Sequence, residues 1–186
     1  MLDDYPKRII LKDHSECSFH TEWGHDKKGL EDFFKRVSTD DLWVLKRDYT
    51  QPESLDKFLQ SLENQEGIRL FAYQNGKIIG MGGIQYTRFG AYKNIGEVEI
   101  LIDEDYKKNR LGTWIILELI SLASSLHLEL LRIELIAGKD DPAIIASRRL
   151  NFTPQATLKN YLRDRKGRFV DLVILIKEIA EEWSDF

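Results

Sequence analysis

The sequence has few cysteines that could cross-link the chain, no long apolar run that could span a membrane, and few prolines that would break helices or strands. One cysteine, Cys17, and four prolines occur among 186 residues. A single cysteine excludes an intramolecular disulfide framework and a thiolate zinc cluster. Charged residues or glycine break every apolar run well short of the ~20 residues that a membrane-spanning helix needs. The first residues place acids before bases, unlike a secretory signal. We therefore expect a cytoplasmic chain with no membrane partner.

The chain also lacks a large excess of either positive or negative charge. Lys plus Arg total 27 and Asp plus Glu total 31, so the net charge is -4. This balance argues against a surface built for nucleic acid, and any phosphate site must be local. The 42% of hydrophobic residues is too high for a disordered chain. We find no repeat or linker, and we expect a single domain over residues 1–186.

Apolar periodicity predicts two early helices and a hairpin. Four apolar residues of 27–37 and four that follow Pro52 fall at i, i+3, i+4 and i+7, which puts each set on one helix stripe. Asn75 and Gly76 lie between two β-rich runs and tolerate the positive φ of a tight hairpin turn. The other expected elements are a hairpin of Arg8–Leu11 and Glu16–Thr21, strand Ile95–Asp103, helix Leu111–His127, strand Leu131–Ala137, helix Pro142–Leu150 and two strands within Ala156–Ile179. Hairpins and strand–helix alternation together predict an α/β fold with a mixed, mostly antiparallel sheet flanked by helices.

The segment EVEILIDEDYKKNRLGTWII combines a strand, a polar turn and the start of an apolar helix. Backbone N–H groups at such a helix start lack intrahelical partners, and with the helix dipole they favour an anion. Lys107, Lys108 and Arg110 add positive charge there, and Gly112 permits close approach. The alternative is a solvated basic loop with a helix cap.

Five segments resemble, in order, the GCN5-related N-acetyltransferases (GNAT family). They are PKRIILKD, YQNGKIIG, the segment above, RRLNF and LKNYLRDRKGRFVDLVILIKEI. The family signature is Arg or Gln, two residues, Gly, one residue, then Gly or Ala. Lys107 replaces the Arg or Gln, Arg110 replaces the first Gly, and Gly112 matches the second. If the first position needs glycine, Arg110 strains the loop. If it does not, the guanidinium is free to pair with a phosphate.

The resemblance implies transfer of an acetyl group from acetyl-CoA to an amine by direct attack, without a covalent enzyme intermediate. The pantetheine arm is expected along the strand backbone at Leu101 and Ile102, as an added strand would lie. The residues expected to hold the pyrophosphate are Lys107, Lys108, Asn109, Arg110, Leu111, Gly112 and Thr113. A backbone N–H near Leu101 is the expected oxyanion donor.

The attacking amine needs a base, for which a carboxylate is expected. Glu97, Glu99 and Asp103 alternate along the strand and share a face. Glu97 matches the family best and Glu99 is second; the alternative is that these acids face solvent or pair with Lys and Arg. The tyrosine that many members use to protonate the departing thiolate falls at Ser147. Tyr161 is the substitute candidate, although packing is the commoner role of a tyrosine in a sheet.

One further position affects the interpretation of the cofactor site. Asp140, where family members often carry Asn, repels a polyanionic cofactor unless its carboxylate faces away.

The acceptor is expected to be a small-molecule or peptide amine. Its pocket is expected to involve Trp23, Trp43 and the loop Arg88–Tyr92, with burial in the core as the alternative for each tryptophan. Neither Cys17 as a nucleophile nor a metal site is expected.

Together, the departures Arg110, Asp140 and Ser147 favour a rival function, a non-catalytic acyl-CoA-binding sensor or interaction module. An edge strand near the C-terminus makes a homodimer reasonable.

Overall fold

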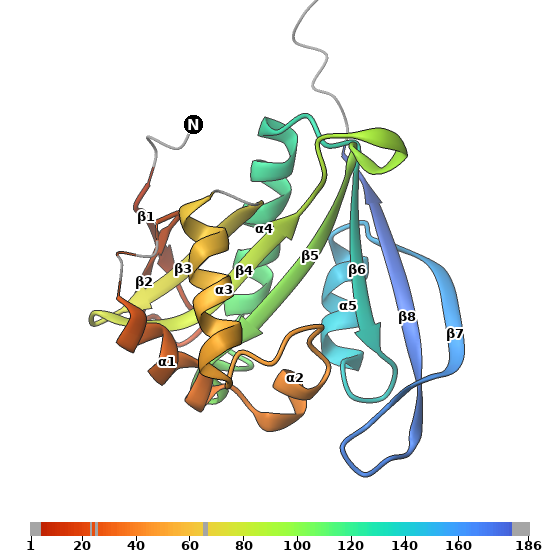
Figure 1. Cartoon of the computed structure of the whole chain (residues 1–186). Helices are drawn as coiled ribbons and strands as arrows, with labels where there is room; N and C mark the ends of the chain where they lie inside the picture. The colour runs from red at the N-terminus through yellow and green to blue at the C-terminus, as the bar shows by residue number, and fades with distance from the viewer. Residues whose placement is uncertain (1–4, 23, 25, 65–66, 180–186) are drawn as a thin grey trace, which may run out of the picture. The chain divides into compact units, whose positions relative to one another are not determined.

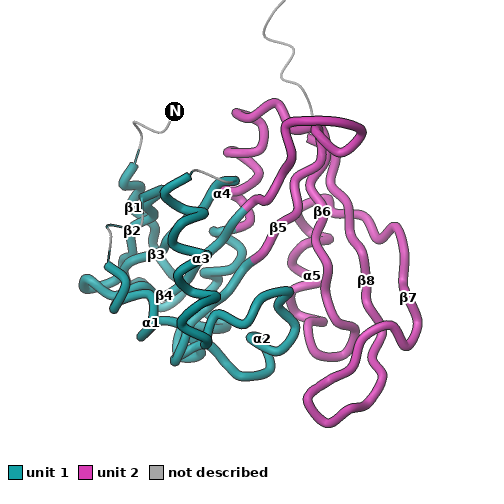
Figure 2. The backbone as a smooth tube through the Cα atoms, viewed as in Figure 1, with its two compact units in different colours: residues 1–83, 100–115 teal, residues 84–99, 116–186 magenta. Residues whose placement is uncertain are grey.

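The structure is a computed structural model that describes residues 5–22, 24, 26–64 and 67–179. The chain divides into two compact units, coloured separately in Figure 2. Unit 1 comprises residues 1–83 and 100–115, and unit 2 comprises residues 84–99 and 116–186. The single domain over 1–186 stays a prediction.

Unit 1 contains most of the N-terminal half of the chain (Figure 1). Its elements are β1 (Lys7–Ile10), β2 (Glu16–His20), α1 (Lys27–Arg36), α2 (Thr39–Trp43), α3 (Pro52–Glu63), β3 (Ile68–Gln74) and β4 (Lys77–Gln85), whose last two residues belong to unit 2. The strands lie in the order β1-β2-β3-β4. β1 pairs antiparallel with β2, and β2 pairs antiparallel with β3.

The predicted stripes form the core of unit 1. The apolar residues of α1 and α3 pack together with residues of β3, β4 and the end of β5 in one cluster. Phe33 and Phe58 are fully buried, and Tyr49 stacks on Phe34 at 4.9 Å between ring centroids. At the start of α1, the Asp26 side chain accepts a hydrogen bond from the Gly29 N–H and so caps the helix. The helical spacing therefore correctly identified which faces are buried.

The predicted hairpin turn is confirmed. Asn75 and Gly76 both have positive φ, 50° and 75°, between β3 and β4. A two-residue turn of this kind matches the twist of the strands that flank it.

Unit 2 contains a pair of parallel strands. β5 (Ile95–Ile102) pairs parallel with β6 (Leu130–Ile136), from Ile95 opposite Leu130 to Val98 opposite Ile133. Its other elements are the C-terminal part of α4 (Leu111–Ser125), α5 (Asp141–Arg149), β7 (Thr153–Arg163) and β8 (Phe169–Glu178). The order is β5-β6-β8-β7, and β8 is antiparallel to both neighbours. Figure 1 shows β8 inserted between β6 and β7.

The predicted fold class is confirmed: the chain has a mixed α/β fold with a mostly antiparallel sheet flanked by helices. The short helix α2 was not predicted, because it has no buried residue and therefore no apolar stripe in the sequence. None of the helices in the described residues has the length and apolar character needed to cross a membrane.

Candidate active site

The polar turn before α4 has the features of an anion site. We call Lys107–Thr113 the anion loop. It follows β5 and a short 3-10 turn, Glu104–Tyr106, and its last three residues form the start of α4. The first bond of the helix runs from the Trp114 N–H to the Arg110 carbonyl. Within the described chain, the six amides from Lys108 to Thr113 donate no hydrogen bond to another protein group. Six successive unpartnered donors at a positive helix end favour an anionic ligand.

Two residues of the anion loop are held in the left-handed region. Lys108 has φ 62° and Arg110 has φ 64°. For residues with a Cβ this conformation costs roughly 1–2 kcal/mol each. The position at which the family has its first glycine therefore does require a glycine-like backbone, and Arg110 adopts it under strain. The first of the two alternatives from the sequence is the one that the backbone supports.

Side-chain contacts hold the anion loop at two points within unit 1. The Lys107 ammonium lies 2.6 Å from the carboxylates of both Asp41 and Glu104. Burial opposes the charge on Lys107, but these two hydrogen bonds outweigh it and raise the pKa of the ammonium. The Asn109 side chain is hydrogen-bonded to Asp13. The charge of Lys107 is thus already paired within the protein.

Lys108 and Arg110 are the positive side chains that the loop leaves to solvent. Both are exposed, and neither forms an ion pair with a described residue. Gly112 has a packing role, because an added Cβ would lie 3.0 Å from Cδ1 of Ile102. Leu111 is buried and Thr113 is half-buried. Leu101 is also buried, so its side chain belongs to the core of unit 1 and only its backbone can face a ligand.

Glu97 lies in a separate cavity that is formed entirely by unit 2. The cavity measures about 580 Å³. Its lining is mostly apolar and aromatic: Gln85, Tyr86, Thr87, Tyr92, Ile95, Glu97, Arg132, Gln155, Ala156, Ile174 and Ile176. A guanidinium nitrogen of Arg132 lies 3.5 Å from Oε1 of Glu97, and Arg132 also pairs with Glu134. Glu97 is 46% exposed and therefore both paired and accessible.

The other two catalytic candidates do not line this cavity. Glu99 follows Glu97 by two residues on β5 and is half-buried. Tyr161 lies on β7 and is 60% exposed, five residues along the strand from Ala156. At about 3.3 Å per residue, this separation is roughly 17 Å along β7. The structure therefore brings Glu97, but not Tyr161, to the cavity.

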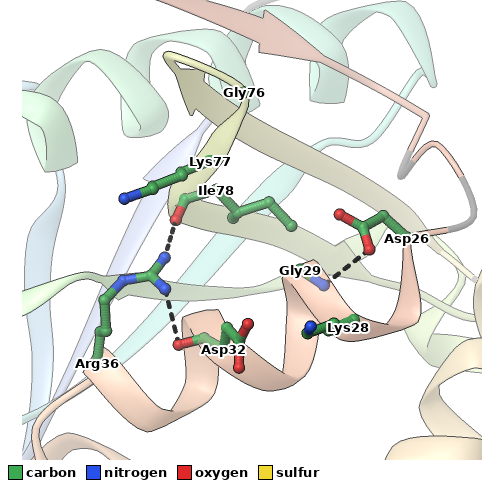
Figure 3. Close-up of a pocket in the computed structure, with 8 residues that line it drawn as sticks. All are labelled: Asp26, Lys28, Gly29, Asp32, Arg36, Gly76, Lys77 and Ile78. Carbon is green, nitrogen blue, oxygen red and sulfur yellow. Dashed lines mark hydrogen bonds between the residues drawn. The ribbon is translucent and has the colours of Figure 1, made fainter.

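Asp103 has a different role from the one that its position in the sequence suggests. It is 3% exposed, and one of its carboxylate oxygens accepts a hydrogen bond from Arg36. Figure 3 shows the Arg36 guanidinium also donating to the backbone carbonyls of Asp32 and Ile78. Asp103 thus joins α1 to the end of β5 and is unsuited to proton transfer. The cavity in Figure 3, about 220 Å³, contains none of the predicted site residues.

Two of the departures from the family pattern have clear surroundings in unit 2. The Asp140 carboxylate accepts a hydrogen bond from the Ile136 N–H at 2.8 Å and pairs with Lys139 at 3.0 Å. Its charge is therefore already bound by neighbouring groups of the protein. Ser147 is 1% exposed, and its hydroxyl has no hydrogen-bond partner in the described structure. A buried serine in this state cannot act as a general acid.

The expected acceptor-pocket residues have mixed outcomes. Tyr92, from the predicted loop Arg88–Tyr92, lines the cavity that contains Glu97. Trp43 is 55% exposed, so burial in the core is wrong for it. Trp23 lies outside the described residues. Sequence reasoning missed Arg132 and Tyr86; the polar alternation of Arg132 and Glu134 within the apolar β6 is the signal that points to this face.

Other reactive side chains offer no alternative centre. Burial raises the pKa of the Cys17 thiol to about 11, so the nucleophilic thiolate is suppressed. No group of three metal-binding side chains occurs among the residues that the structure describes.

Comparison with known proteins agrees with the geometry. The family model of the acetyltransferase (GNAT) family matches residues 30–152. No curated protein sequence matches the chain.

Several solved structures share the fold. An N-acetyltransferase from Staphylococcus aureus Mu50 is 17% identical and has a TM-score of 0.74, with 89% of this chain and 100% of that chain covered. The ribosomal-protein-S18-alanine N-acetyltransferase of Escherichia coli is 19% identical, with a TM-score of 0.69 and coverage of 91% and 98%. The yncA protein of Salmonella typhimurium, solved with its cofactor acetyl-CoA, is 15% identical, with a TM-score of 0.74 and coverage of 91% and 98%. At these identities the structures establish the fold, whereas the family model spans more than half of the sequence, and the chain therefore belongs to the GNAT acetyltransferase family.

Proposed function

We propose that the protein transfers an acetyl group from acetyl-CoA, the acyl donor of its family, to an amine acceptor. The observation that carries this proposal is the row of six unpartnered amides from Lys108 to Thr113 at the start of α4. These amides suit the pyrophosphate of the donor, because a diphosphate offers acceptors and negative charge to a positive helix end. The exposed Lys108 and Arg110 add charge at the same place.

The pantetheine arm and the thioester of the donor are proposed to lie beside β5. The pantetheine arm is expected along the backbone at Leu101 and Ile102, as an added strand would lie. A backbone N–H near Leu101 is the proposed donor to the thioester oxygen as it gains negative charge.

Glu97 is the proposed general base, with Glu99 second. The acceptor amine gives a proton to the carboxylate, and its nitrogen forms a bond to the acetyl carbon. The carbon–sulfur bond then breaks, and the coenzyme thiolate takes up a proton from water, because Tyr161 does not line the cavity. Glu97 is favoured because it is partly exposed in a largely apolar cavity that can take the body of an amine.

The acceptor is proposed to be a small-molecule or peptide amine. A peptide amine is included because one structural neighbour is named for acetylating an alanine of ribosomal protein S18. A cytoplasmic location and a homodimer remain parts of the proposal.

One observation favours the rival function, a non-catalytic acyl-CoA-binding module. Ser147 occupies the position of the tyrosine acid, and its hydroxyl is buried without a partner. A chain that has lost this acid and has no replacement would bind the donor without transferring the acetyl group.

Thermal unfolding with acetyl-CoA and with CoA tests donor binding. Ligand at a hundredfold excess over its dissociation constant adds about 2.7 kcal/mol to the free energy of unfolding. No shift with either ligand would overturn both functions. Release of free thiol during incubation with a panel of polyamines, amino acids and peptides then separates them, because a shift without transfer supports the module.

A matched pair of variants tests whether the amides bind the donor. Thr113→Pro removes one unpartnered N–H in the first turn of α4, where proline is tolerated. We expect its dissociation constant for CoA to rise about tenfold, whereas Thr113→Ala, which keeps the amide, should change it little. Equal constants for the two variants would remove the amide from the site.

A further inference from the structure

The connection between β1 and β2 holds the anion loop from a distant part of the sequence. The Asp13 N–H donates to Oδ1 of Asn109 at 3.0 Å, and Nδ2 of Asn109 donates to Oδ2 of Asp13 at 2.8 Å. The Lys12 N–H donates to the Asn109 carbonyl at 3.2 Å. Three hydrogen bonds thus join two segments that are 96 residues apart, all within unit 1.

The Asp13 carboxylate is held in place for this contact. Its other oxygen, Oδ1, accepts hydrogen bonds from the Ser15 N–H at 3.0 Å and the Ser15 hydroxyl at 2.7 Å. The hydrogen bonds from Ser15 and Asn109 together lower the pKa of Asp13. The carboxylate therefore presents Oδ2 to Asn109 in a set orientation at neutral pH.

Asn109 lies between the two strained residues of the loop. Lys108 and Arg110, on either side of it, both have left-handed φ. An arginine or lysine released from restraint leaves this region for one of negative φ, whereas glycine occupies both signs of φ about equally. Fixing Asn109 by its side chain and its carbonyl limits the rotations open to both neighbours.

We propose that Asp13 is a positioning residue: through Asn109 it keeps the anion loop in its anion-binding conformation, in place of the glycine that the family has at position 110. This inference rests on the proposed donor-binding function. Asp13 touches no reacting atom, and its effect is on the fraction of molecules in which the amides of 108–113 are arranged for the donor.

The size of the effect follows from the left-handed preference. Without the hydrogen bonds to Asn109, residue 110 by itself should hold the left-handed conformation in about one molecule in ten when it is arginine and in about one in two when it is glycine. The apparent dissociation constant rises as that fraction falls. Loss of Asp13 should therefore matter about five times more when residue 110 is arginine.

The test is a cycle of dissociation constants for CoA, measured by calorimetry. Asp13→Ala removes the carboxylate that accepts from Asn109 and Ser15, but it keeps the N–H donors of residues 13 and 12. It should therefore raise the constant by up to about tenfold in the natural sequence and by no more than about twofold in an Arg110→Gly background. Asp48→Ala is the matched control, because Asp48 makes the same bonds to Thr50, N–H at 3.0 Å and hydroxyl at 2.5 Å, and is exposed like Asp13. The control should leave the constant unchanged.

A second measurement needs no ligand. In the left-handed region the Hα and amide hydrogen of one residue lie close together, so Lys108 and Arg110 should give strong intraresidue NMR contacts. Asp13→Ala should weaken these contacts and Asp48→Ala should not. Persistence of both contacts in Asp13→Ala, or equal effects of this change in the two backgrounds, would overturn the inference. A natural protein that shows the contacts but binds no CoA overturns the proposed function instead.

Discussion

Glu97 and Asp103 are acids of one segment that the sequence predicts as a strand, but Glu97 lies within β5 and Asp103 follows its last residue, Ile102. Their surroundings differ. Glu97 is 46% exposed, lines a cavity and lies beside Arg132 at 3.5 Å. Asp103 is 3% exposed and is bonded to Arg36, which also donates to two backbone carbonyls. Alternation in the sequence predicted one shared face for both acids, but their burial and their partners in the structure distinguish a candidate base from a structural ion pair.

The largest expected effect is on Glu97. Glu97→Gln removes the proton acceptor and keeps the shape, so kcat should fall by at least about 100-fold. The free energy of unfolding should change by less than about 1 kcal/mol, because the pair with Arg132 is long, at 3.5 Å, and partly exposed. Steady-state thiol release and urea denaturation measure the two quantities. A full rate in Glu97→Gln together with a slow Glu99→Gln would transfer the role of base to Glu99.

The Asp103 change should act on stability instead. Asp103→Ala leaves the Arg36 guanidinium without its carboxylate, and we expect a loss of about 3 kcal/mol in the free energy of unfolding. Asp105→Ala, an exposed acid of the same turn, should stay within about 0.5 kcal/mol. Chemical denaturation compares the two. If both variants are equally stable, the buried pair contributes nothing and the contrast with Glu97 is lost.

Cys17 extends the comparison to a buried acidic group whose pKa is raised by burial alone. The folded pKa is about 11 against an ordinary value of 9.0. The unfolded thiol ionises first as the pH rises, so this contribution to stability is complete below pH 9 and is lost between pH 9 and 11. Between about pH 8 and about pH 10.5 the expected loss is about 2 kcal/mol. Cys17→Ala should lack this part of the pH dependence, and identical pH profiles would contradict the assignment.

Two buried serines give the smallest contrast. The Ser147 hydroxyl has no partner, whereas the Ser61 hydroxyl donates to the Phe58 carbonyl at 2.7 Å. Removing an unsatisfied buried group is favourable, and alanine suits a helix better than serine. Ser147→Ala should therefore raise the free energy of unfolding by about 1 kcal/mol, and Ser61→Ala should lower it by up to about 1 kcal/mol. A loss of stability in Ser147→Ala would mean that its hydroxyl is bonded in solution.

Much of the fold was predictable because its signals are local. The apolar stripes of α1 and α3 repeat at helical spacing, and Asn75–Gly76 marks a tight turn between β-rich runs. The helix α2 was missed because it buries no residue. β6, α5 and β7 follow one another in the chain, but β8 lies between β6 and β7 in the sheet. No local pattern in the sequence specifies this insertion.

The candidate site was predictable only in outline. Charge, glycine and a helix start indicated the anion loop, and the resemblance to the family favoured Glu97 among the three acids that alternate in the sequence. The left-handed φ of Arg110, however, has no local signature in the sequence, because residues with a Cβ rarely adopt it, and the pairing of Lys107 with Asp41 depends on the placement of α2. Tyr161 was chosen for its chemistry alone, and its distance along β7 from the cavity could not be read from its position in the chain.

The sequence by itself determined the types of the main elements, the faces that they bury and the resemblance to the GNAT family, because each of these is encoded in short spacings and ordered motifs. Only the tertiary structure decided that Arg36 neutralises Asp103, 67 residues away, and that Asp13 meets Asn109, 96 residues away. Such contacts join segments whose meeting depends on how whole strands and helices pack, and a polar side chain carries no local mark of its distant partner.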